Sequence, residues 1–113
     1  MATTEMNCLA SGENDPIYHE YSATAMGVYT TPTLDFTPTC VMITGVLNGY
    51  RLISVYDSKY GENNMAQILG TALAYVNFPN TTANGIGNVD TANKTVTFLT
   101  GGMTDIDIYI MGY

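Results

Sequence analysis

The clearest hydrophobic pattern lies in the segment TDIDIYIMGY (104–113), where apolar and polar residues alternate strictly. Side chains of a β-strand point to opposite faces with a period of two, so the alternation predicts a half-buried strand. It assigns six residues to two faces: Ile106, Ile108 and Ile110 to one, and Asp105, Asp107 and Tyr109 to the other. We expect the isoleucine face to pack in the core.

A second pattern predicts a β-hairpin in the middle of the chain. The run CVMITGV (40–46) is apolar and of strand length, and a β-rich run follows at 50–57. Asn48-Gly49 separates the two runs, and this dipeptide is the strongest short-range signal for a two-residue hairpin turn. We therefore expect 40–46 to pair with 50–57.

The segment 65–76 fits two periodicities. One is a helical stripe, made of Met65, Leu69, Leu73 and Val76. The other is a pair of strands separated at Gly70-Thr71, which the β-rich neighbouring segments favour. We interpret 65–76 as two strands.

The remaining segments complete an all-β pattern. Pro32 and Pro38 predict strands at a sheet edge or strands that begin beside a bend. We expect a loop over 79–88, a turn near 91–93 and a strand over 94–100. The sequence thus predicts an antiparallel β-sandwich of about seven to eight short strands. We assign residues 1–22 to a polar N-terminal arm and 23–113 to the sandwich domain.

The charge balance excludes some partners. The chain has 3 Lys and Arg residues against 10 Asp and Glu residues, a formal charge of −7. Binding of nucleic acid rests on basic side chains that neutralise phosphates, so it is not expected, nor is binding to anionic membranes. No apolar run approaches the roughly 18 residues of a membrane span, and the N-terminus does not resemble a signal peptide. Cys8 and Cys40 lack metal-type spacing, and reduced thiols are expected in a cytosol. The alternative is a disulfide between Cys8 and Cys40, if the protein later leaves the cell.

Several side chains could carry chemistry, but a structural interpretation is stronger for each. Asp105 and Asp107 could form a calcium site or an acid–base pair, or simply the solvated face of the last strand. His19 has no assignable partners and fits an exposed position on the arm. Cys40 opens an apolar strand and fits the core better than a nucleophile. We therefore expect no enzymatic activity, no catalytic residues, no metal site and no cofactor.

Four tyrosines near predicted turns and strand ends could form a binding surface. They are Tyr50, Tyr56, Tyr60 and Tyr75. Flat aromatic faces beside amide and hydroxyl groups suit a glycan or another polar surface. The alternative is that these rings pack inside the sandwich or between subunits.

From about residue 27 to 113, roughly three quarters of the chain, the order of features resembles the C-terminal β-domains of bacteriophage and prophage tail fibres and related virion appendages. The segment LDFTPTCVMITG (34–45) is similar to the family's aromatic residue, proline and apolar strand. KTVTFLTGG (94–102) is similar to its penultimate strand and turn, and YIMGY (109–113) to its closing strand.

The resemblance implies a non-enzymatic β-sandwich that forms a homotrimer and binds a host cell-surface receptor or glycan. A fibre has a long shaft before its tip, whereas only about 22 polar residues precede this domain. This departure from a tail fibre leaves room for a short head fibre, a decoration protein or a tail-tip accessory, attached to other virion proteins through the arm. We expect synthesis in the bacterial cytoplasm and location in the virion. The alternatives are a free-standing carbohydrate-binding or adhesion module, and a small metal-dependent enzyme using Asp105 and Asp107.

Overall fold

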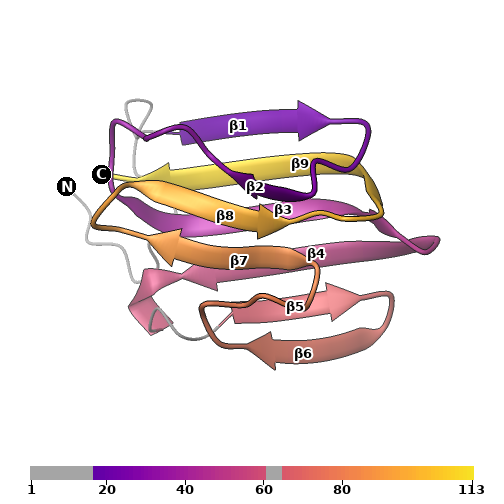
Figure 1. Ribbon diagram of the computed structural model, residues 1–113. Coiled ribbons are helices and arrows are strands. Elements are labelled where there is room, and N and C mark those ends of the chain that lie inside the picture. Colours follow the sequence, from indigo (N-terminus) through magenta and orange to yellow (C-terminus); the bar gives the residue numbers. More distant parts are fainter. Residues whose placement is uncertain (1–16, 61–64) are drawn as a thin grey trace.

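The computed structural model describes residues 17–60 and 65–113, which form two antiparallel sheets (Figure 1). The strands are β1 (Ile17–Ser22), β2 (Val28–Thr30), β3 (Pro38–Leu47), β4 (Tyr50–Asp57), β5 (Met65–Leu69), β6 (Ala72–Val76), β7 (Gly85–Asp90), β8 (Thr95–Leu99) and β9 (Met103–Gly112), with a short 3-10 helix, η1 (Ser58–Tyr60), after β4. The larger sheet has the order β1-β9-β3-β4-β5-β6, and the smaller one β2-β8-β7. The predicted all-β sandwich is confirmed, with nine strands in these residues.

The core lies between the two sheets and is built from alternate residues of their strands. Hydrophobic residues with no exposed surface are Val41, Ile43, Leu52, Met103, Ile106, Ile108 and Ile110 from the larger sheet, and Ile86, Val96 and Phe98 from the smaller one. In the pairing of β3 with β9, Val41 lies opposite Ile110 and Ile43 opposite Ile108. The isoleucine face predicted for the last strand is confirmed.

Both predicted hairpins are present, and their turns follow from glycine geometry. Asn48 and Gly49 have φ values of 53° and 82°, which is the left-handed pair that a type I′ turn requires. Gly70 has a positive φ of 61°, whereas the φ of Thr71 is not positive. This is the pattern of a type II′ turn. The interpretation of 65–76 as two strands is confirmed, because the type II′ turn reverses the chain between β5 and β6.

Two predicted boundaries need correction. Residues 17–22 belong to the sheet rather than to an arm, because β1 pairs with β9 along its whole length. Residues 1–16, the rest of the predicted arm, lie outside the described residues. The expected loop over 79–88 ends earlier, since β7 begins at Gly85. The glycines of this segment suggested a loop. Gly87 instead lies within β7, where the lack of a side chain lets a neighbouring backbone segment come close. A Cβ at Gly87 would be 3.2 Å from the Asn80 carbonyl oxygen.

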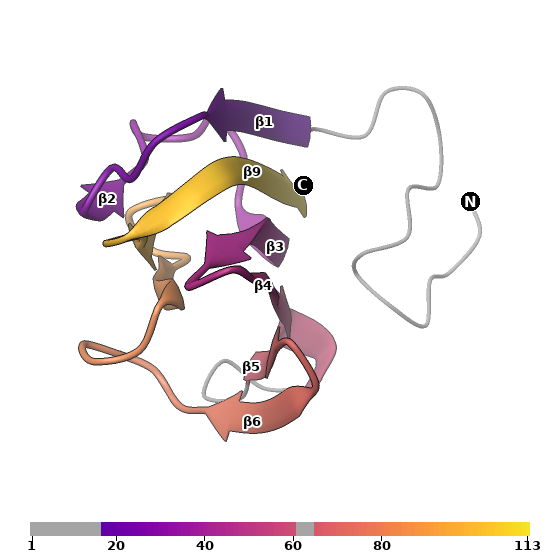
Figure 2. The ribbon, with the colours of Figure 1, turned by 90° about the vertical axis from the view of Figure 1, so that its right-hand side faces the viewer.

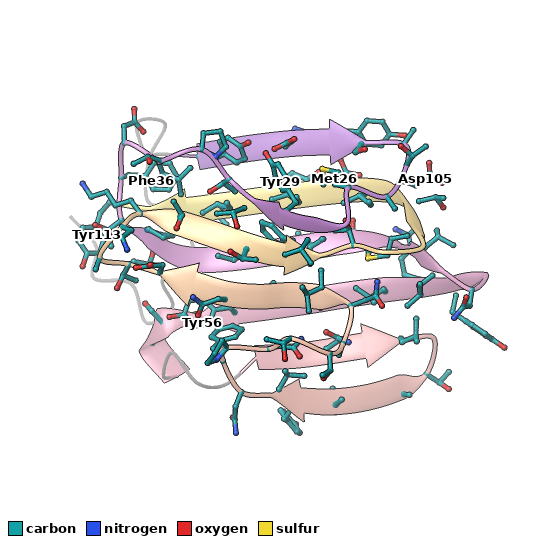
Figure 3. All side chains as sticks on the ribbon, in the orientation of Figure 1. Met26, Tyr29, Phe36, Tyr56, Asp105 and Tyr113 are labelled. Atoms are coloured by element: carbon teal, nitrogen blue, oxygen red, sulfur yellow. The ribbon has the colours of Figure 1, made fainter. Side chains whose placement is uncertain are left out.

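The end of β9 is joined to the segment before β3. The Thr37 N–H donates to the Tyr113 carbonyl (N···O 2.7 Å), and the Tyr113 N–H donates back to the Thr37 carbonyl (3.2 Å). A Cβ at Gly112 would overlap the Thr37 carbonyl and would lie 2.9 Å from the Phe36 ring, so any other residue would force the backbone to shift. Phe36 and Tyr113 lie at one end of the sandwich, opposite the end that holds Met26 and Asp105 (Figure 3).

The two sheets differ in size, so the smaller one cannot cover the larger one completely. Figure 2 shows β1 and β6 at opposite ends of the larger sheet. The smaller sheet packs on β3 and β4 through β7. In β6, Ala72, Leu73, Ala74 and Tyr75 are all exposed, which means that both faces of this strand meet solvent. The β5–β6 hairpin therefore extends beyond the covered core.

Truncating a core isoleucine tests this account of the fold. Ile108→Ala removes a side chain with no exposed surface, so we expect a loss of about 2–5 kcal/mol in the free energy of unfolding. Ile17→Ala makes the same chemical change at a residue that is 59% exposed, where about 0.5 kcal/mol or less is expected. Denaturant unfolding of both variants measures the difference, and equal losses would contradict the assigned core.

Candidate functional site

The four predicted tyrosines occupy different environments. Tyr56 is 1% exposed, and its ring centroid lies 5.3 Å from that of Phe78 (Figure 3), so it belongs to the core and cannot contact a ligand at the surface. Tyr50 is 60% exposed and Tyr75 is 74% exposed. Tyr60 ends η1, but its side chain lies outside the described residues.

Tyr50 and Tyr75 do not form one site. Tyr50 follows the type I′ turn and lies against Gly70, where a Cβ would be 3.1 Å from its ring. Tyr75 is opposite Ala66, which is opposite Val55 in β4. Because side chains alternate along a strand, Tyr75 shares the outer face of the sheet with Val55, whereas Tyr50 points to the other side. The predicted tyrosine surface is therefore divided.

A polar group covers the outer face of β1 and β9. The His19 Nε2 lies 3.0 Å from Asp107 Oδ1, and the His19 ring stacks on Tyr109 with centroids 4.6 Å apart. The Tyr21 hydroxyl donates to Asp105 Oδ1 at 3.3 Å. His19 thus has partners in the sheet rather than a place on an arm. Within residues 17–60 and 65–113, no three His, Cys, Asp or Glu side chains gather closely enough to hold a metal ion.

Glu20 links the two sheets at the other face of β1. Its Oε1 accepts hydrogen bonds from the Tyr18 and Tyr29 hydroxyls, each at 2.5 Å. Burial, together with the hydrogen bonds to Glu20, raises the pKa of both phenols above the usual value. Both phenols therefore stay protonated and donate to Glu20, and the cluster joins β1 to β2.

Cys40 is disulfide-bonded, which corrects the expectation of a reduced thiol in the core. It is 2% exposed and lies opposite Asp57 in the pairing of β3 with β4. Cys8, the second cysteine of the sequence, lies outside the described residues.

Two shallow hollows flank the smaller sheet. One, of about 270 Å³, is lined by Phe78, Pro79 and the segment 88–92. The other, of about 230 Å³, is lined by residues of 27–28, 81–84 and 99–101. Asp90 in the first hollow accepts hydrogen bonds from the Asn93 backbone (3.0 Å) and side chain (2.8 Å), and these bonds lower its pKa. An aromatic ring beside amide and carboxylate groups could accept a small polar ligand.

The most unusual surface is the outer face of the β5–β6 hairpin, which we call the hairpin surface. It consists of Ile68, Leu73 and Tyr75, which are 40%, 57% and 74% exposed. Ile68 lies opposite Leu73, so their side chains are neighbours on one face. From Met65 to Val89 the sequence has no Asp, Glu, Lys, Arg or His residue. An exposed apolar surface without charge is a candidate for contact with another protein.

The backbone of β6 adds to this surface. Among the described residues, this strand ends the larger sheet and has β5 as its one neighbour in the sheet order. An edge strand presents unpaired N–H and C=O groups to which another strand can bind. Tyr75 was predicted as a surface residue in this region, whereas Ile68 and Leu73 were not. The absence of charge over 65–89 is the signal that could have indicated them.

No family model, curated protein or solved structure matches this chain. The part of the chain that the structure describes contains no helix long and apolar enough to cross a membrane. Function is therefore inferred from the geometry of the surfaces described above.

Truncation of two tyrosines should separate the core from the surface. Tyr56→Ala should cost about 3–5 kcal/mol of unfolding free energy, by analogy with other buried aromatic residues. Tyr50→Ala, at an exposed tip, should cost about 0.5 kcal/mol or less. Thermal unfolding followed by circular dichroism compares the two. A Tyr56→Ala protein as stable as the wild type would refute the buried assignment.

Proposed function

We propose that this chain is a non-enzymatic structural component of a phage or phage-like virion, such as a fibre tip, head fibre or decoration protein. The observation that carries the proposal is the uncharged, apolar hairpin surface at an open sheet edge, in a chain with a formal charge of −7. Such a surface is suited to lasting contact with other protein subunits.

The charge distribution supports assembly of like subunits. Two copies with a charge of −7 repel each other, and the repulsion is weakest where the contact surface carries no charge. The hairpin surface offers such a place, since 65–89 has no charged residue. Burial of Ile68, Leu73 and Tyr75 would add hydrophobic stabilisation at about 25 cal/mol per Å² of apolar area. We infer that self-association is part of the function.

The resemblance to virion appendage domains also supports the proposal. The segments that carry it form β3, β8 and β9 with the residues around them. The disulfide at Cys40 agrees with a protein that leaves the cytoplasm in a released particle. Attachment to other virion proteins and contact with a host cell-surface receptor or glycan are part of the same proposal.

A second candidate is a free-standing carbohydrate-binding or adhesion module. The hollow beside Phe78 favours it, because Asn88 and Asp90 place polar groups next to an aromatic ring in a space of about 270 Å³. Sugar binding relies on this combination of an aromatic face and hydrogen-bonding groups. Tyr50 and Tyr75, on opposite sides of the larger sheet, contribute no shared platform to this hollow.

Particle labelling tests the virion proposal. Antibodies raised against the purified chain should bind phage-like particles separated by density gradient from a lysate of the source cells. Immunogold electron microscopy measures this, and particles from a strain lacking the gene are the control.

Gradient fractions with particles but without the chain would contradict the virion role. Glycan-array binding by the monomeric chain, lost in Asn88→Ala and retained in Tyr50→Ala, would then favour the carbohydrate-binding module.

A further inference from the structure

The geometry of the β5–β6 hairpin determines which backbone groups of β6 are open. In a two-residue hairpin, the residues that flank the turn exchange both of their backbone hydrogen bonds, and here these are Leu69 and Ala72. Antiparallel pairs alternate between bonded and non-bonded, so Ala74 is also bonded to β5. Leu73 and Tyr75 therefore direct their N–H and C=O groups away from the sheet.

The other edge strands have features that discourage pairing with a second chain. β1 carries His19 and Glu20, and β2 is a strand of three residues. At β7, the Asn80 N–H donates to the Gly87 carbonyl at 2.6 Å, so a neighbouring segment occupies part of this edge. Charged residues, short length and coverage are the means by which edge strands avoid association.

β6 has none of these features. Its sequence, ALAYV, contains no charge and no proline, and its first four residues are exposed. A strand exposed on both faces gains little from its own domain, because burial of side chains supplies most of the stability of a sheet. A neighbour that pairs with β6 would bury Leu73 and Tyr75 and satisfy the open backbone groups.

We propose that this neighbour is β6 of a second copy of the chain, paired antiparallel across a two-fold axis at Ala74. The two six-stranded sheets then join into one continuous sheet. The proposal rests on the self-assembling function proposed above and assigns the contact that performs it. A second copy is favoured because an antiparallel edge complements itself under two-fold symmetry. Uncharged β6 also lets two acidic chains meet without like charges in contact.

The register follows from the open backbone groups. With the axis at Ala74, Leu73 of one copy lies opposite Tyr75 of the second copy, and each such pair exchanges both hydrogen bonds. The two side chains share the outer face, where an aromatic ring and an aliphatic chain form a favourable cross-strand pair. Ile68 lies opposite Leu73 on the same face, so the two hairpin surfaces merge into one apolar band.

A cysteine at the axis provides a direct test. The two copies of residue 74 form a non-hydrogen-bonded pair with Cα atoms about 4.5 Å apart, within the range of about 4.4–6.8 Å that a disulfide allows. Ala74 is exposed, so Ala74→Cys is a mild change. Ala72→Cys is the matched control. It lies on the same strand and face, but opposite Val76 of the second copy, and its two sulfurs are too far apart to bond.

Mild oxidation should convert most of the Ala74→Cys protein into a covalent dimer of twice the 12.2 kDa chain mass, and should leave Ala72→Cys and wild type without this cross-link. In light scattering, Tyr75→Pro should weaken the wild-type dimer by about tenfold or more, because proline removes an outward N–H and obstructs the edge. The N–H of residue 75 makes no bond to β5 in this register, so the fold is retained, which circular dichroism verifies.

Three results would overturn the proposal. Equal cross-linking of Ala74→Cys and Ala72→Cys would refute the register. A wild-type trimer whose Ala74→Cys form does not cross-link would refute the two-fold pair and leave self-assembly standing, as in a ring in which β6 meets β1. A monomer at every concentration, without cross-link, would contradict both the pair and self-assembly, while particle labelling would still decide the virion role.

Discussion

The packing of β9 between β1 and β3 in the larger sheet is the constraint on which the rest of the structure depends. This strand pairs with β1 on one side and β3 on the other, and its three isoleucines, Ile106, Ile108 and Ile110, are fully buried. A shift of one residue would place Asp107 in the core, at a cost of several kcal/mol for an unpaired charge. The register of β9 therefore fixes both neighbours, and through β3 it fixes the hairpin to β4.

The same sheet also creates the exposed region. The larger sheet has six strands and the smaller sheet has three. Because the smaller sheet packs on β3 and β4, β6 is left exposed on both faces. An edge that neither charge nor coverage protects would favour non-specific aggregation. The proposed pairing with a second copy would resolve this conflict, because it would turn the edge into an interior strand pair. Under this proposal, the incomplete coverage of one domain is the basis of assembly.

Much of the fold followed from local sequence chemistry, whereas the surface did not. Alternation in 104–113 and the Asn48-Gly49 turn predicted β9 and the central hairpin, because these signals act between residues close in sequence. The strand at 17–22 was missed because β9, far along the chain, holds it in the sheet. Tyr56 appeared to be a surface residue because exposure depends on tertiary packing, which a single sequence does not reveal. The open edge of β6 required strand order, which is also a long-range property.

Amide hydrogen exchange at two protein concentrations tests the central claim most directly. In dilute solution, the Leu73 and Tyr75 amides should exchange at the rate of unprotected groups, whereas the Ala74 amide, bonded to β5, should be slow. At high concentration, the account predicts that Leu73 and Tyr75 become protected while Ala74 changes little. Fast exchange of the Leu73 and Tyr75 amides at every concentration would contradict a paired β6 edge.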